Sequence, residues 1–125
     1  MFELSQTFTF DAAHTLKRHV SPEEAAGSRR IHGHTYTAEV AVRGPCSLDT
    51  GMVMDLSLLR AALAEVRSQL DHHLLDEVPG LGTPTLENLC VFIFDQVRAR
   101  IAQVEVSMVS VSRAAGDRCV YRPQA

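Results

Sequence analysis

Two stretches in which apolar and polar residues alternate constrain the fold of this chain most. Residues 2–10 carry mostly apolar side chains at even-numbered positions, and residues 34–43 show the same pattern. Because successive side chains of an extended strand point to opposite faces, each stretch predicts a strand with one apolar face. The even-numbered phase of the first stretch continues to His14, and His32 and His34 lie in the phase of the second.

These three histidines are candidate metal ligands. His32 and His34 leave an extended backbone on the same side, roughly 7 Å apart, and a third imidazole could close a site between them. His14 is the candidate for that third ligand because it continues the apolar phase of the first strand. Three imidazoles form the ligand set of a catalytic zinc site with a fourth position open. The alternative is that each histidine is an ordinary packed residue.

The middle of the chain changes to a helical period. Asp55 is the expected N-cap of a first amphipathic helix. Thr83 and Pro84 are expected to begin a second helix, with Thr83 as its cap and Glu87 in its first turn. The predicted buried positions are Leu56, Leu59, Leu63, Val66 and Leu70 in the first helix, and Leu86, Leu89, Cys90, Ile93, Val97 and Ile101 in the second.

Alternation returns near the C-terminus. The apolar phase changes around Met108, which predicts a β-bulge there, and residues 115–117 read as a hairpin turn before a returning strand at 118–122. The order is therefore two strands, two helices and two strands. We expect one α+β domain over residues 1–125, with an antiparallel sheet and both helices on one face.

Composition narrows the function classes. Twelve basic and fifteen acidic residues give a net charge of −3, so we expect no general attraction to nucleic acid or an anionic membrane. No apolar run reaches the roughly 18 residues that would cross a bilayer, and the first residues do not read as a secretion signal. Three widely spaced cysteines do not suggest a disulfide framework, so we expect a cytoplasmic protein.

Residues 15–30 read as a long loop between proposed metal ligands, and such loops are often functional. The segment carries a cluster of basic residues. These are Lys17, Arg18, Arg29 and Arg30. They form either a solvated surface or a local anion pocket beside the metal.

Taken together, several motifs resemble those of the 6-pyruvoyl-tetrahydropterin and 6-carboxy-tetrahydropterin synthase family, in order and spacing over nearly the whole chain. They are Phe10–His14 (FDAAH), Ile31–Tyr36 (IHGHTY), Gly51–Asp55 (GMVMD), Leu70–His72 (LDH), Pro84–Glu87 (PTLE) and Cys119–Tyr121 (CVY). The resemblance implies the tunnelling fold, in which ββααββ subunits assemble into rings, commonly as a homohexamer with active sites between subunits. It also implies a pterin substrate.

The resemblance implies roles for individual residues. His14, His32 and His34 would hold Zn²⁺, which polarises the hydroxylated side chain of the substrate. Asp71 and His72 match the family's proton relay, whereas their purely structural reading is a helix C-terminus with a favourable cation. The other residues expected to contact substrate are Thr85, Glu87, Arg29 and Arg113. Bacterial members typically convert 7,8-dihydroneopterin triphosphate to 6-carboxy-tetrahydropterin on the route to queuosine, so the implied enzyme class is a zinc-dependent carbon–oxygen or carbon–carbon lyase.

The sequence departs from the family pattern at two places. The usual catalytic cysteine, four residues before the first histidine of H-G-H, is Ser28 here, and a serine hydroxyl is far less acidic than a thiol. Glu23 or Glu24 could supply a carboxylate base instead. The late-strand glutamate that normally grips the pterin is also missing from residues 109–114, which contain no carboxylate and place Arg113 there. Either the alignment slips around the extra residues before Cys119, or the ligand is not held as a pterin usually is.

Three functions remain open. The first is a zinc-dependent enzyme acting on a dihydropterin triphosphate, with the basic loop receiving phosphates. The second is a diverged paralogue that keeps the metal scaffold but binds or transforms another small heterocycle or anion. The third is a non-catalytic protein in which zinc steadies the oligomer. The Asp71–His72 pair favours chemistry, whereas Ser28 and Arg113 favour altered chemistry.

Overall fold

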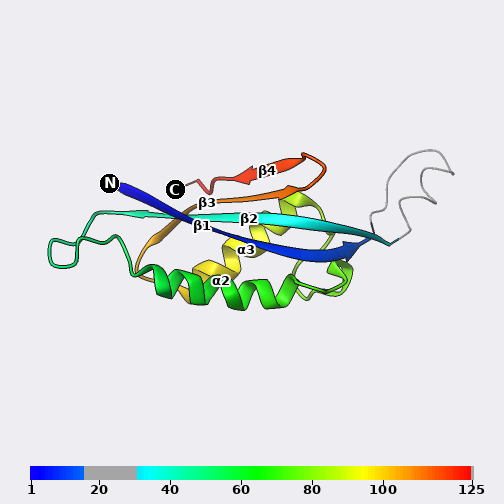
Figure 1. Ribbon diagram of the computed structural model, residues 1–125, viewed down its shortest axis with the longest axis horizontal. Coiled ribbons are helices and arrows are strands. Elements are labelled where there is room, and N and C mark those ends of the chain that lie inside the picture. Colours follow the sequence, from blue (N-terminus) through cyan, green and yellow to red (C-terminus); the bar gives the residue numbers. More distant parts are fainter. Residues whose placement is uncertain (16–30, 125) are drawn as a thin grey trace.

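The computed structural model describes residues 1–15 and 31–124, which form one four-stranded sheet and two long helices (Figure 1). Of the proposed loop only Thr15 is described. The rest of the loop lies outside the described residues and includes Ser28, Arg29 and both candidate glutamates. The elements in chain order are β1 (Phe2–His14), β2 (His32–Gly44), α2 (Leu56–Leu70), the 3₁₀ turn η1 (Leu75–Glu77), α3 (Leu86–Arg100), β3 (Glu105–Arg113) and β4 (Arg118–Tyr121).

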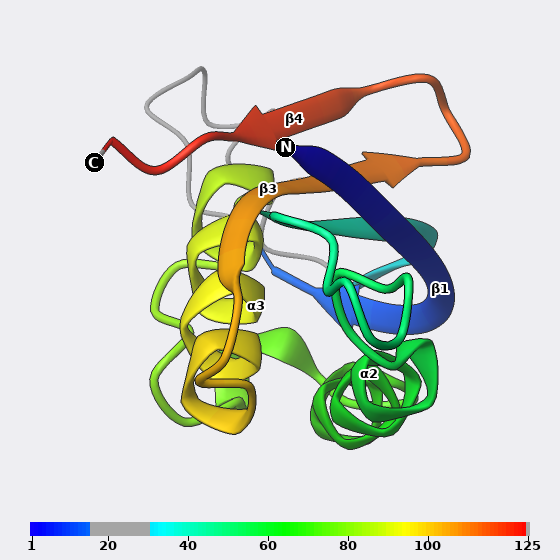
Figure 2. The ribbon, with the colours of Figure 1, turned by 90° about the vertical axis from the view of Figure 1, so that its left-hand side faces the viewer.

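The strands are arranged in the order β1-β2-β3-β4, and every neighbouring pair is antiparallel. Figure 2 shows α2 and α3 on the same side of this sheet. The expected α+β architecture is therefore confirmed. The first two strands are longer than predicted. β1 continues through Ala12 and Ala13 to His14, and β2 begins at His32. All three histidines therefore lie within the strands.

The even-numbered side chains of β1 and β2 form the floor of the core. Phe10, Tyr36, Val40 and Val42 are each no more than 1% exposed, and the Phe10 and Tyr36 rings stack with centroids 4.8 Å apart. Burial of this apolar face against the helices is the main driving force for folding. The opposite face is polar, as shown by the hydrogen bond from Ser5 Oγ to Glu39 Oε2 at 2.9 Å.

The start of α2 was predicted correctly, and the start of α3 was not. Asp55 caps α2, where its Oδ1 accepts a hydrogen bond from the Ser57 N–H at 2.9 Å. The N-cap of α3 is Thr85 rather than Thr83, because Thr85 Oγ1 accepts from the Asn88 N–H at 3.1 Å. Pro84 therefore precedes the cap. Thr83 instead contributes its carbonyl, which accepts from Asn88 Nδ2 at 2.9 Å.

The C-terminal hairpin follows the prediction. Ala41 pairs with Met108 and Val42 with Val106, so Ser107 is the extra residue of a bulge next to the expected position. The turn before β4 contains Gly116 at φ 107°, a conformation that glycine adopts without strain. None of the helices in the described residues is long and apolar enough to cross a membrane.

Candidate functional site

The three histidines gather on one face at the far end of β1 and β2. His14 and His32 are direct partners in the strand register, so their side chains leave the same face of the sheet, and His34 follows two residues later on β2. The ring centroids of His14 and His34 lie 5.0 Å apart with nearly parallel planes, and those of His14 and His32 lie 6.4 Å apart. The structure therefore agrees with the prediction, made from the apolar phase of the two strands, that the three imidazoles share one face.

The surroundings of His14 fit a metal ligand. Its side chain is 5% exposed, and both ring nitrogens are buried without a hydrogen-bond partner among the described residues. Buried polar atoms are rarely left unpaired, and such an exception calls for a bound ion, a water or a functional role. Burial, followed by the neighbouring His14 and Arg113, lowers the pKa of His34 below its usual 6.5, which favours the neutral imidazole that metals bind.

The His14 and His34 rings nevertheless stack, and the His32 ring is tilted against His14, so the three do not converge on one point. Within residues 1–15 and 31–124, no group of three or more His, Cys, Asp or Glu side chains stands in an arrangement that could hold a metal ion. Binding of one ion by His14, His32 and His34 requires the rings to rotate from this arrangement. The zinc assignment therefore stays a prediction.

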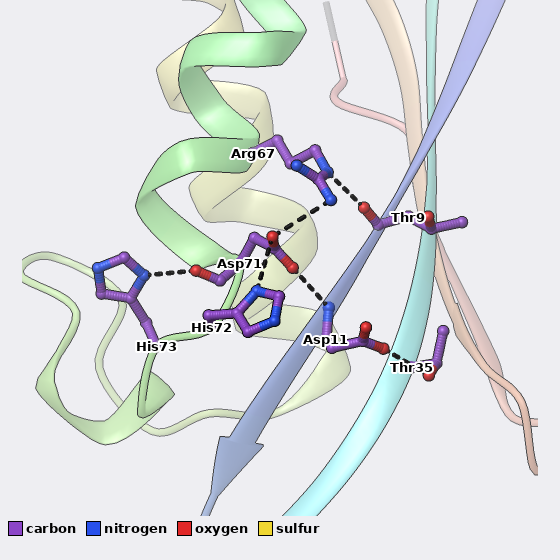
Figure 3. A network of polar contacts seen from close by, with 7 residues as sticks. All are labelled: Thr9, Asp11, Thr35, Arg67, Asp71, His72 and His73. Carbon is purple, nitrogen blue, oxygen red and sulfur yellow. Dashed lines mark hydrogen bonds and ion pairs between the residues drawn. The ribbon is translucent and has the colours of Figure 1, made fainter.

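A second polar cluster forms where α2 ends (Figure 3). Asp71 is the C-cap of α2, and its side chain is 15% exposed. Oδ1 accepts from the backbone N–H of Asp11 at 2.9 Å, and Oδ2 lies 2.8 Å from His72 Nδ1 and 3.2 Å from Arg67 Nη2. The hydrogen bonds from Asp11 and His72 are the main reasons that the pKa of Asp71 lies below its usual value.

The segment after α2 is held against the outer edge of β1. The His72 N–H donates to the Asp11 carbonyl at 2.7 Å, and the Ala13 N–H donates to the His73 carbonyl at 3.2 Å. His72 adopts φ 59°, which is uncommon for a residue other than glycine. Backbone strain of this kind concentrates at functional sites, where the surrounding contacts enforce it.

One cavity, open to solvent, touches both clusters, at His34 and at His72. Its volume is about 510 Å³, and it is lined by residues from the ends of β1 and β2 and from the segment after α2. Its lining is Asp11, Ala12, Ala13, Gly33, His34, Thr35, His72, His73 and Leu74. His34 of the proposed metal set and His72 of the proposed relay thus face the same space, which is large enough for a small-molecule ligand.

The remaining predicted site residues are placed differently. The Thr85 hydroxyl caps α3, and Glu87 is exposed in the first turn of that helix, so the structure gives both a structural explanation. Arg113 ends β3 opposite Tyr36, on the side of the sheet that carries the imidazoles. The predicted contributions of Ser28 and Arg29 fall outside the described residues.

Sequence reasoning missed three residues that support the site. Asp11 provides both backbone groups that hold Asp71 and His72, and Arg67 links Asp71 to the Thr9 carbonyl, which its Nε reaches at 2.7 Å. Asp76 accepts from the Thr15 N–H at 2.7 Å and from its hydroxyl at 2.5 Å, which fixes the chain directly after His14. The sequence does contain a signal for Arg67, because a basic and an acidic residue four positions apart in a helix lie close enough to form an ion pair.

Comparison with known proteins identifies the family of this chain. The family model described as 6-pyruvoyl tetrahydropterin synthase matches residues 3–124. The chain is 32% identical to 6-carboxy-5,6,7,8-tetrahydropterin synthase of Bacillus subtilis, over 98% of this chain and 86% of that protein. It is 33% identical to dihydroneopterin monophosphate aldolase of Pyrococcus furiosus, over 74% of this chain and 72% of that protein.

A solved structure gives the same result for the fold. The 6-pyruvoyl tetrahydropterin synthase of Caenorhabditis elegans superimposes with a TM-score of 0.84 at 24% identity, over 98% of this chain and 96% of that one. The strand order, the two helices and the histidine-bearing ends of β1 and β2 are thus set in a known architecture. From the sequence match over nearly its full length, this chain belongs to the 6-pyruvoyl tetrahydropterin synthase family.

Proposed function

We propose that this protein is a zinc-dependent enzyme of the 6-carboxy-tetrahydropterin synthase type, acting on 7,8-dihydroneopterin triphosphate or a related pterin. The observation that carries this proposal is His72, which lines the same cavity as His34 and whose imidazole is paired with Asp71. Relatives over most of the chain are named for pterin chemistry, which supports the substrate class. In this reading the reaction is of the lyase type.

The contacts of Asp71 suit His72 to move a proton. Because Asp71 stays ionised and lies 2.8 Å from Nδ1, it favours the tautomer with a proton on Nδ1 and leaves Nε2 able to accept one. The same carboxylate stabilises the imidazolium that forms after proton transfer. Arg67 and the Asp11 N–H hold Asp71 in position, so the pair does not reorganise during the reaction.

In the proposal, His14, His32 and His34 hold the metal. Zn²⁺ bound there would supply a Lewis acid that polarises an oxygen of the substrate side chain. Both His14 ring nitrogens are buried and lack a hydrogen-bond partner within residues 1–15 and 31–124, which supports this assignment. Asp76 serves as a positioning residue, because its two hydrogen bonds to Thr15 fix the end of β1 directly after His14.

A second proton-transferring group is proposed in place of the family's cysteine. Cys46 is remote from the cavity within this subunit, since it follows the end of β2 that pairs with Phe2. That end lies roughly 40 Å along the strands from His14. We assign the role to Ser28 or to a carboxylate at Glu23 or Glu24, and the receipt of substrate phosphates to Arg29.

The proposal also includes a ring of subunits in the cytoplasm, commonly a hexamer, on the route to queuosine. The sheet has β1 and β4 as its edges, and an edge strand can pair with another chain. A four-residue outer strand and a cavity at the margin of the sheet suit a site that adjoins a second subunit.

The second candidate function is a diverged paralogue with another small-heterocycle ligand or without catalysis. It is favoured by Arg113, which would present a donor where the resemblance implies an acceptor. The Pyrococcus furiosus relative shows that a protein of comparable similarity carries a different activity name.

The decisive experiment is turnover of 7,8-dihydroneopterin triphosphate by zinc-loaded protein, followed as release of triphosphate and acetaldehyde. We expect turnover in the native protein and a loss of about 10²- to 10⁴-fold in Asp71→Asn and His72→Gln. Asp95→Asn, an equally small change on the exposed side of α3, is the matched control and should keep full activity. Tight pterin binding without turnover would support the diverged paralogue instead.

A further inference from the structure

Arg113 lies on the same face of the sheet as the imidazole cluster. It is the last residue of β3 and the direct register partner of Tyr36, so the two side chains leave the same face. His34 lies two residues before Tyr36 on β2, and the rings of these residues meet edge to face with centroids 5.7 Å apart. Arg113 therefore borders the cluster from the neighbouring strand.

The guanidinium of Arg113 has a donor that is not paired within the part of the chain that the structure describes. Its side chain is 26% exposed, and Nη2 lies 2.8 Å from Asp117 Oδ2. Nε is buried and has no hydrogen-bond partner among the described residues. A buried guanidinium donor is normally paired, and an oxyanion is the acceptor that suits it best.

The charge of Arg113 lies at the margin of the cluster, because Arg113 is the register partner of Tyr36, whose ring meets the His34 ring. Its ion-pair partner Asp117 is 60% exposed, so solvent screens that carboxylate more strongly than the better buried guanidinium. The margin of the cluster therefore favours a ligand atom that accepts hydrogen bonds and carries negative charge.

We propose that Arg113 is a specificity-determining residue whose Nε–H binds an oxyanion, a carboxylate or a phosphate, carried by the ligand next to the imidazoles. This inference rests on the proposed function, because it takes the ligand to be a pterin. In this role Arg113 donates a hydrogen bond to the ligand, whereas a carboxylate would accept hydrogen bonds from the amino groups of the ligand. The ligand is selected by its acceptor group at this position.

Fluorescence titration of the zinc-loaded protein with paired ligands tests the inference. The pairs are pterin with 6-carboxypterin, and neopterin with neopterin monophosphate. We expect the native protein to prefer one oxyanion-bearing ligand over its neutral partner by about tenfold or more. The pair that shows the preference identifies the oxyanion as a carboxylate or a phosphate.

Variants separate the outcomes. Arg113→Gln should bring the ratio of the two affinities, oxyanion-bearing over neutral ligand, close to one while the neutral ligand binds as before. Arg113→Lys keeps the charge but lacks Nε–H, so it should lose most of the preference. The lysine variant decides if the glutamine variant does not fold. Asp117→Asn leaves the guanidinium in place and should keep the preference.

Three results would overturn the inference, and they differ in what else they overturn. If the native protein binds the neutral pterins but shows no oxyanion preference, or if the preference survives in both Arg113 variants, only the role of Arg113 is wrong. If it binds none of the four ligands, the proposed pterin function fails together with it.

Discussion

Asp71 is the residue on which most contacts of the candidate site converge, and its ionisation should contribute to stability. Its folded-state pKa lies below the ordinary 3.8, mainly through the Asp11 N–H and His72. A lowered pKa means that the carboxylate form is favoured by folding, so this contribution is complete above about pH 5 and is lost as the pH falls below 3.8. We expect Asp71→Asn to be less stable than the native protein at pH 7, with a gap that closes in acid.

Urea unfolding at a series of pH values measures this gap. Asp95→Asn is the control for loss of an exposed carboxylate, and it should follow the native protein throughout. A difference between native protein and Asp71→Asn that stayed constant from pH 7 to pH 3 would show that the carboxylate charge contributes nothing.

His72 allows backbone strain to be separated from chemistry. At φ 59° an alanine is strained and a glycine is not, whereas both lack the imidazole. We expect His72→Gly to be more stable than His72→Ala by about 1 kcal/mol in chemical denaturation, and both to be equally poor catalysts. Equal stabilities would mean that the chain relaxes to negative φ when the histidine is removed.

The residues of the site differ in how far the sequence could predict them. The three histidines follow from strand phase, because alternation alone determines which side chains share a face. Asp11 could not be predicted in the same way, since it acts through its backbone, whose N–H and carbonyl meet Asp71 and His72 from a segment 60 residues away. Side-chain type carries no signal for a contact of this kind.

At the scale of elements, the start of α3 offers a direct test. Thr85 Oγ1 accepts from the Asn88 N–H, whereas the Thr83 hydroxyl has no such role in the helix. We expect Thr85→Ala to cost about 1 kcal/mol of unfolding free energy, and Thr83→Ala to change it by less than about 0.5 kcal/mol. Thermal or urea unfolding of the two variants measures this, and the reverse order would restore Thr83 as the cap.

This element also shows why helix ends are difficult to predict. Both threonines can cap, and Pro84 between them fits the first turn after Thr83 as well as the position before Thr85. The choice depends on Asn88, whose side chain binds the Thr83 carbonyl while its backbone N–H binds Thr85. Such a three-residue arrangement depends on geometry that periodicity does not contain.

At the scale of the whole molecule, the order of strands and helices was predictable and the cavity was not. The alternation of β1, β2, β3 and β4 and the two helical stripes determine the layers, because each apolar face must be buried. The cavity arises where residues 72–74 attach to the outer edge of β1, including the parallel bridge of Ala13 with Leu74. That contact joins distant segments through backbone groups, so no local pattern predicts it.

Zinc binding should appear in the stability of the whole molecule. A ligand that binds only the folded state stabilises it by about 2.7 kcal/mol at a concentration 100 times its dissociation constant. We expect zinc at that concentration to raise the unfolding free energy of the metal-free native protein by this amount. In His14→Gln the effect should fall close to zero, because the most buried of the three candidate ligands is lost.

His73→Gln is the matched control, since His73 lies on the segment after α2 and its Nδ1 already contacts the Asp71 carbonyl at 2.8 Å. It should keep the full stabilisation by zinc. The core beneath the cluster is built from Phe10, Tyr36 and the helices, so the metal-free protein should remain folded and make the comparison measurable. A zinc effect of the same size in His14→Gln as in the native protein would remove His14 from the ligand set and, with it, the physical case for a metal at the end of β1 and β2.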